Sequence, residues 1–179
     1  MIILGVDPSS RSAGYGLIEY SKRKVRLITC GCIRPKESEF EDRLVHIFDE
    51  MTRLIGEYAP EEGAIEDTFV GKDARTAAKL DQARGGLIIA MRKAGLPIAH
   101  YTPATVKKAV AGNGQATKER VQYMVSQVLA LKELPKPLDA SDALAIALCH
   151  TQRSSQVISE GKGQRKPEVE ALLSRMVRR

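Results

Sequence analysis

Three strand-like segments follow one another at the start of the chain without a helix between them, and this order limits the folds available. Residues 2–6 are an apolar run closed by Asp7-Pro8, and residues 14–20 and 25–33 continue the series. After residue 33, segments with helical and strand-like patterns alternate. The expected helices are 39–58, 73–94, 103–110, 117–131 and 139–150, and the further strands are 63–66 and 98–101. This order predicts an α/β fold with a mixed five-stranded sheet flanked by helices.

The last 29 residues differ in composition from the rest of the chain. Residues 151–179 carry seven Lys and Arg against three Glu, so they hold +4 of the total net charge of +6. We expect a globular domain over residues 1–150 and a basic C-terminal tail over 151–179 that is partly disordered in isolation. The excess of positive charge favours a polyanionic partner, although charge alone is weak support for nucleic acid.

The cysteines indicate a reducing compartment. Cys30, Cys32 and Cys149 are odd in number, and their spacing fits neither a disulfide framework nor a zinc site. Cys30 and Cys32 would share one face of a strand, which is typical of small core residues. We expect no secretory leader, because the opening residues show no basic region or cleavage site, and no apolar run approaches the ~18 residues that a membrane span requires. These features predict a cytoplasmic protein.

Four carboxylates are candidates for one site. Asp7 and Glu66 each stand at the carboxyl end of a strand, where sites form in open sheets, and Asp139 and Asp142 lie three residues apart on one helix. Each has another interpretation. Asp7 could be a turn residue, Glu66 a solubilising charge, and the helical pair a capping arrangement. Asp67 points to the opposite sheet face from Glu66, so only one of these two can join the site.

The composition of this set has a chemical meaning. Four carboxylates without a His or Cys partner suit a hard cation such as Mg²⁺ or Mn²⁺. Without a cation, clustered carboxylates would raise one another's pKa. Two divalent ions about 3.5–4 Å apart would remove the repulsion and stabilise both oxygens of an in-line phosphodiester displacement. The set therefore predicts a metal-dependent phosphodiesterase.

Several separate segments resemble the RuvC family of Holliday junction resolvases in order and spacing. They are Leu4-Gly5-Val6-Asp7-Pro8, Gly14-Tyr15-Gly16, Gly31-Cys32-Ile33, Ala64-Ile65-Glu66, Gln82-Ala83-Arg84-Gly85 and residues 139–145, Asp-Ala-Ser-Asp-Ala-Leu-Ala. The resemblance covers about residues 1–150 and implies an RNase H-like fold and a homodimer. It also implies Mg²⁺ dependence, with Mn²⁺ as a substitute and two ions per subunit. The catalytic, metal-binding acids it implies are Asp7, Glu66, Asp139 and Asp142. One departure is Ser9, where the family usually has Gly.

The same resemblance implies an activity and partners. The family makes paired symmetric nicks in four-way DNA junctions during recombination and repair, and its branch-migration partner is the RuvA–RuvB complex. Basic positions of the family match Lys107 and Lys118, and a base-stacking aromatic matches Phe69. Lys72 and Arg75 lie near Phe69 and are further candidates for phosphate contacts. The sequence alone favours solvated lysines and a core position for Phe69, and the resemblance is what favours contacts with DNA.

Other functions remain to be weighed. An ATPase of the actin and sugar-kinase type shares the opening strands, but the chain is too short for its two lobes. An RNase H-like nuclease that acts on ribosomal RNA precursors and a non-catalytic junction-binding module are further alternatives. For the dimer, we expect helix 73–94 to form the interface through small and apolar side chains. These are Ala74, Ala77, Ala78, Ala83, Gly85, Gly86, Leu80, Leu87, Ile88 and Met91.

Overall fold

A computed structural model gives the fold of the chain over residues 1–9, 11–67 and 73–160. Three strands, β1 (Ile2–Pro8), β2 (Ala13–Ser21) and β3 (Lys24–Ile33), form an antiparallel meander. Two shorter strands, β4 (Glu62–Glu66) and β5 (Ile98–Tyr101), extend the sheet in parallel with β1. The strand order is β3-β2-β1-β4-β5. The predicted mixed five-stranded sheet is therefore confirmed.

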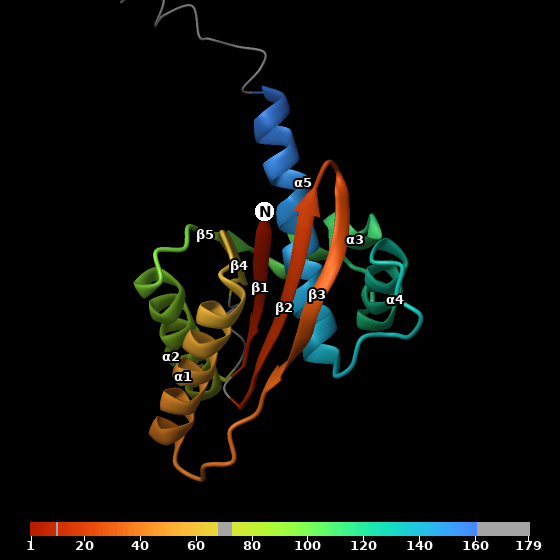
Figure 1. Ribbon diagram of the computed structural model, residues 1–179. Helices are drawn as coiled ribbons and strands as arrows, with labels where there is room; N and C mark the ends of the chain where they lie inside the picture. Colours follow the sequence, from red (N-terminus) through yellow and green to blue (C-terminus); the bar gives the residue numbers. More distant parts are fainter. Residues whose placement is uncertain (10, 68–72, 161–179) are drawn as a thin grey trace, which may run out of the picture.

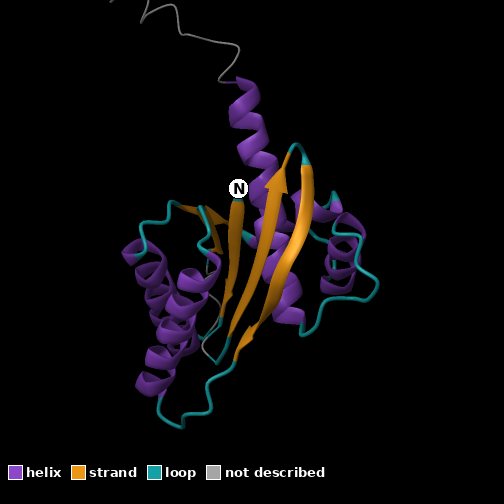
Figure 2. Cartoon of the chain, in the orientation of Figure 1, coloured by secondary structure: helices purple, strands orange, loops and turns teal. Residues whose placement is uncertain are grey.

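Helices cover both faces of the sheet (Figures 1 and 2). They are α1 (Phe40–Tyr58), α2 (Ala74–Lys93), α3 (Pro103–Ala111), α4 (Lys118–Val128) and α5 (Leu138–Glu160). Alternate residues of β1 divide the core: Leu4 and Val6 pack with α1 and α2, whereas Ile3 packs with α3, α4 and α5. No helix in the described residues is both long enough and apolar enough to cross a membrane.

Two helix ends differ from prediction. Helix α5 continues to Glu160, so the predicted end at His150 is wrong and the expected domain boundary at residue 150 falls inside a helix. No Gly or Pro occurs between residues 151 and 160 that would break the helix. Helix α4 ends at Val128 instead of Leu131, because Ala130 adopts a left-handed conformation with φ 49°.

Two glycines let α5 approach the sheet closely. A Cβ on Gly5 would lie 2.1 Å from the carbonyl oxygen of Ala143, and one on Gly14 would lie 2.2 Å from the carbonyl oxygen of Asp139. Because no side chain fits at either position, the backbone of α5 packs directly on β1 and β2. The first turns of α5 are thus held beside the carboxyl end of β1.

The edges of the sheet are formed by two unlike strands. Strand β5 has four residues, whereas β3 has ten and begins with the exposed Lys24. The pairing of β2 with β3 shifts register between Leu17 and Ile18. Such an irregularity increases the local twist of the strand pair.

Candidate active site

Three of the four predicted acids meet at the carboxyl ends of β1 and β4. These strands are parallel neighbours with Val6 opposite Ile65, so Asp7 and Glu66 occupy the next position on each. Together with Asp142 from the second turn of α5, they line one pocket of about 250 Å³. Lys107 and Lys118 line it as well, beside an apolar wall of Pro103, Val106, Val121, Ala145 and Ile146.

The carboxyl groups of Asp7 and Glu66 are hydrogen-bonded to each other. Burial is the main cause that raises the pKa of Asp7 to about 8, and the charges of Glu66 and Asp142 add to it. Burial also raises the pKa of Glu66, while Lys118 and Lys107 act in the opposite direction. The pair therefore holds a proton at neutral pH as long as no cation neutralises it.

Lys118 places a positive charge directly against the acids of the pocket. Its Nζ donates to Asp142 Oδ2 at 2.9 Å, and this hydrogen bond is the main cause that raises the pKa of Lys118. Lys118 begins α4, where the Thr117 hydroxyl accepts from the backbone N–H of Arg120 and caps the helix. The cap fixes the start of α4, so Lys118 is held against the carboxylates.

Asp139 is placed differently from the other three acids. Its Oδ2 accepts hydrogen bonds from the Ser12 hydroxyl at 3.2 Å and the Cys32 thiol at 3.4 Å, and it does not line the pocket. Burial is the main cause that raises the pKa of Cys32. Within the described residues, no three acidic, His or Cys side chains are close enough together to hold one metal ion. The structure thus gathers Asp7, Glu66 and Asp142, with Asp139 at their border.

The predicted DNA-binding residues have different outcomes. Lys107 lies at the pocket, as does Lys118, whereas Arg75 is exposed in the first turn of α2 and does not line it. Phe69 and Lys72 lie outside the described residues. Ser9 does not have a positive φ, since the non-glycine residues of the described chain that do are Lys22, Arg23, Ala59 and Ala130. The loop after β1 therefore accepts Ser where the family usually has Gly.

Sequence reasoning missed three polar residues that support the acids. Arg84 Nε donates to the carbonyl oxygen of Glu66 at 3.1 Å, and its Nη2 donates to Asp67 Oδ1 at 2.6 Å. Asp67 thus faces away from the pocket, as predicted, and helps to fix the backbone of Glu66. Ser12 and Cys32 are the other two, through Asp139. The sequence pattern predicts a core position for Cys32, and no sequence signal marks its contact with an acid 107 residues away.

Comparisons with known proteins agree with this geometry. The family model described as crossover junction endodeoxyribonuclease RuvC matches residues 3–150. The enzyme of that name from Pelotomaculum thermopropionicum is 46% identical over 151 residues, which cover 84% of this chain and 92% of the relative. The one from Shewanella amazonensis is 46% identical over 160 residues, covering 89% and 92% of the two chains.

Solved structures give the same result for the fold. Thermus thermophilus RuvC, in complex with a Holliday junction substrate, superposes with a TM-score of 0.80 at 34% identity, covering 86% of this chain and 94% of that one. A yeast mitochondrial Holliday junction resolvase shares the fold at a TM-score of 0.61 and 12% identity, covering 88% of this chain and 82% of that one. The predicted RNase H-like fold is confirmed. The chain belongs to the RuvC family of crossover junction endodeoxyribonucleases.

Proposed function

We propose that this chain resolves four-way (Holliday) DNA junctions by hydrolysing phosphodiester bonds in recombination and repair. The observation that carries the proposal is the half-buried Asp7–Glu66 pair, which lies beside Asp142 in a pocket that also contains two lysines. The direct test is incubation of the chain with a synthetic four-way junction and Mg²⁺, alongside duplex DNA, single-stranded DNA and RNA. We expect paired symmetric nicks in the junction alone. Equal cutting of all four substrates would contradict the proposal.

The residues of the pocket fit a hard divalent cation. Asp7, Glu66 and Asp142 supply only oxygen ligands, and the raised pKa of Asp7 reflects burial and the nearby negative charge of Glu66 and Asp142, which a bound cation would offset. We infer that these three acids draw closer together around Mg²⁺ or Mn²⁺, and that Asp139 joins them once it turns from Ser12 and Cys32. Two bound ions would activate the attacking water and stabilise the leaving oxygen.

The remaining groups of the pocket position the substrate. Lys107 and Lys118 line its wall from α3 and α4, so both can contact the oxygens of a backbone phosphate. Lys118 would exchange Asp142 for the phosphate as the charge of the carboxylates is neutralised. The apolar wall excludes bulk water on one side, which strengthens the interactions between charges inside. Arg84 holds the Glu66 carbonyl and keeps that strand end in place.

We expect chelation of divalent ions to abolish cutting. We also expect the stability of the metal-free chain to depend on pH. Without metal, Asp7 is protonated in the folded state up to about pH 8 but ionises at its ordinary pKa of 3.8 in the unfolded chain. The contribution of Asp7 to the free energy of unfolding is thus most favourable below pH 3.8, and it is lost as pH rises to about 8. We expect the melting temperature in chelator to fall over that interval.

The Asp7→Asn variant supplies the comparison for this profile. Its profile should be flatter in chelator, and added Mg²⁺ should raise the melting temperature of the wild-type chain more than that of the variant. Mg²⁺ and Mn²⁺ should restore cutting, whereas Ca²⁺ should not, since its looser coordination positions the reacting oxygens poorly. Cutting at full rate in chelator would refute the metal mechanism.

Removal of either pocket lysine should weaken phosphate binding. For Lys107→Ala and Lys118→Ala, we expect the slope of log K against log salt for junction binding to decrease by about 0.9 each. Lys108→Ala is the matched control, because Lys108 is the exposed neighbour of Lys107 and does not line the pocket. If all three variants had the same slope, Lys107 and Lys118 would be solvated residues without a phosphate contact.

We propose that the working unit is a homodimer, because a junction with approximate two-fold symmetry requires two symmetric nicks. Helix α2 buries Ala83, Leu87 and Met91 against its own core, and its other face exposes Ala74 and Ala78. That face also carries Ile89, which is 55% exposed. A second chain that packs there would cover this apolar area. A partnership with a RuvA–RuvB motor complex remains a prediction from the family.

The dimer proposal predicts the behaviour of Ala78→Arg. The bulky charge should yield monomers that bind junctions but rarely make both nicks, as measured by light scattering and by a supercoiled cruciform assay. Lys93→Gln, at the far end of α2, should leave the dimer intact. A monomeric wild-type chain on a bound junction would rule the proposal out.

A further inference from the structure

A second hollow, of about 410 Å³, is lined by Arg11, Arg43, Thr76 and Lys79. These side chains come from three elements: the loop between β1 and β2, the first turn of α1, and the first two turns of α2. None of the four lines the pocket that contains Asp7 and Glu66. We call this second site the basic hollow.

The three cations of the basic hollow lack carboxylate partners among the residues that the structure describes. Within the described part of the chain, neither Arg11, Arg43 nor Lys79 forms an ion pair, whereas Arg53, Arg84 and Lys118 all do. Asp73 lies close in sequence, but it caps α2 by accepting from the backbone N–H of Arg75 and the Thr76 hydroxyl. Within the described residues, no carboxylate in an ion pair therefore neutralises the positive charge of the basic hollow.

Two of these cations lie near one aromatic ring. Lys79 Nζ lies 5.3 Å from the centroid of the Phe40 ring, and the guanidinium carbon of Arg43 lies 5.7 Å from it. A ring face attracts cations without neutralising them. Mutual repulsion between two cations on one ring is relieved when an anion binds between them.

Arg43 also has unused hydrogen-bonding capacity. Its Nη1 donates to the Ser38 carbonyl oxygen at 3.1 Å, while its Nε is shielded from solvent and has no acceptor in the described part of the chain. A shielded donor without an acceptor is costly, and the cost is greater when the group is charged. An anion bound to the guanidinium would offset part of this cost.

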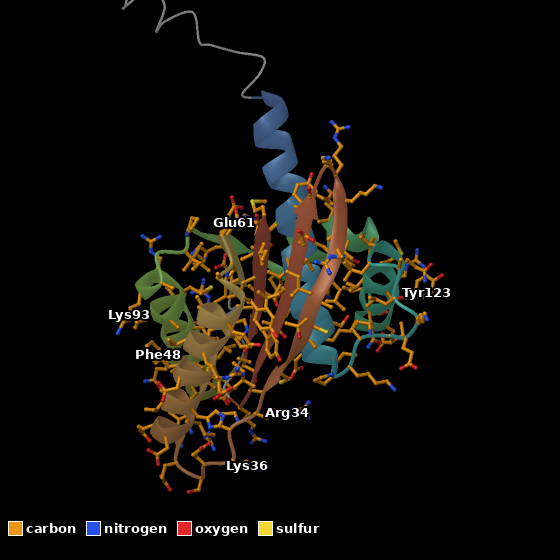
Figure 3. All side chains as sticks on the ribbon, in the orientation of Figure 1. Arg34, Lys36, Phe48, Glu61, Lys93 and Tyr123 are labelled. Carbon is orange, nitrogen blue, oxygen red and sulfur yellow. The ribbon has the colours of Figure 1, made fainter. Side chains whose placement is uncertain are left out.

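The basic hollow is connected to the catalytic acids through the loop after β1. Arg11 follows Asp7 by four residues, so their Cα atoms are at most about 15 Å apart. On this stretch the Ser9 N–H donates to the Ser12 carbonyl, and the Ser12 hydroxyl donates to Asp139. The loop that leads to α1 carries the exposed Arg34 and Lys36, followed by Glu37 and Glu39 (Figure 3).

We propose that the basic hollow binds a backbone phosphate of the DNA substrate, a few nucleotides from the phosphate that is cut. The proposal rests on the proposed function, because it assigns the anion to the same nucleic acid. Arg11, Arg43 and Lys79 supply the charge, and the Thr76 hydroxyl can reorient as a further donor. A contact outside the catalytic pocket would fix how the strand enters the site, since phosphate contacts set register and orientation.

The test compares two double variants that lose the same charge, both in an Asp7→Asn background that prevents cutting. Arg43→Gln/Lys79→Gln removes two cations of the basic hollow. Arg23→Gln/Lys93→Gln removes an exposed arginine of the β2–β3 turn and a lysine that also lies over a Phe ring, 5.7 Å from the centroid of Phe48 (Figure 3). Lys93 follows Lys79 on the same helix by 14 residues, about 21 Å.

For Arg43→Gln/Lys79→Gln we expect junction affinity to fall at least about tenfold, with a salt slope lower by about 0.9–1.8. The control should keep both values. Equal losses in the two double variants would overturn the proposal, because they would show only diffuse attraction. If the double variant melts at a lower temperature, the test is repeated with Lys79→Gln alone, because Lys79 is exposed. An unchanged salt slope for Lys79→Gln would then overturn the proposal.

A set of junctions with one neutral methylphosphonate linkage locates the contact. At one position in the junction, the methylphosphonate should lower the affinity of the chain with an unaltered basic hollow. The same methylphosphonate should not lower the affinity of Arg43→Gln/Lys79→Gln any further. If the losses of affinity caused by the methylphosphonate and by the double variant were additive at every linkage, the proposal would be overturned. Cutting by the chain with Asp7 intact is measured in parallel. If the chain with Asp7 intact cuts junctions but the salt slopes of the binding variants do not change, only the proposal for the basic hollow is refuted. If that chain does not cut junctions, the proposed function is refuted, whatever the salt slopes are.

Discussion

Asp7→Asn should reduce junction cutting by at least about a thousandfold and leave junction binding intact or slightly tighter. The substitution removes a charged ligand from the pocket, and the loss of a single group that stabilises developing charge costs about 10²–10³ even where no metal is involved. It also removes one negative charge that faces the phosphate, which favours binding. Single-turnover cutting and a binding titration measure the two effects. Glu66→Gln, Asp139→Asn and Asp142→Asn should behave in the same way.

The matched control is Asp67→Asn, next to Glu66 on the opposite face of the strand. Asp67 accepts from Arg84 and does not line the pocket, so this change should lower the melting temperature slightly and spare most of the activity. A wild-type rate for Asp7→Asn would remove the carboxylate site from the mechanism. An equal loss in both variants would show only that the region is sensitive to charge.

Gly14→Ala should impair the site from a position that carries no functional group. The new Cβ would lie 2.2 Å from the carbonyl oxygen of Asp139 and 2.7 Å from its carbonyl carbon, so the start of α5 must move. A displacement of about 1 Å at a reacting centre can reduce the rate about a hundredfold. Overpacking typically costs about 1–3 kcal/mol of unfolding free energy. We therefore expect cutting to fall about a hundredfold, together with a lower melting temperature.

Gly56→Ala is the matched control for this substitution. Gly56 is an exposed residue of α1, and a Cβ placed there would meet no atom within 4 Å. Alanine in a helix is favoured over glycine by about 0.5–1 kcal/mol, so this variant should be slightly more stable and equally active. Normal cutting by Gly14→Ala would show that α5 can shift without displacing its acids.

The sequence was sufficient to predict the sheet, the order of the helices and the convergence of three of the four acids, because each rests on a local pattern. Apolar runs that end at Asp7 and Glu66 predict strand ends, and the spacing of Asp139 and Asp142 predicts one helix face. Contacts between distant segments could not be predicted in this way. The bond from Cys32 to Asp139, and that from Arg84 to the Glu66 carbonyl, depend on how helices pack on the sheet. The end of α5 was missed because the change in composition after residue 150 was interpreted as a change in structure.

The two sheet edges affect how the protein behaves at high concentration. An uncovered strand edge can recruit the strand of another molecule, and long, flat, apolar edges are the most prone to do so. Here one edge is the four-residue β5, and the other, β3, begins at Lys24 and pairs with β2 through an irregular register. Neither edge is a regular template for intermolecular strand pairing. Concentrated stocks of the folded protein should therefore stay free of amyloid-like aggregates, as thioflavin fluorescence can verify.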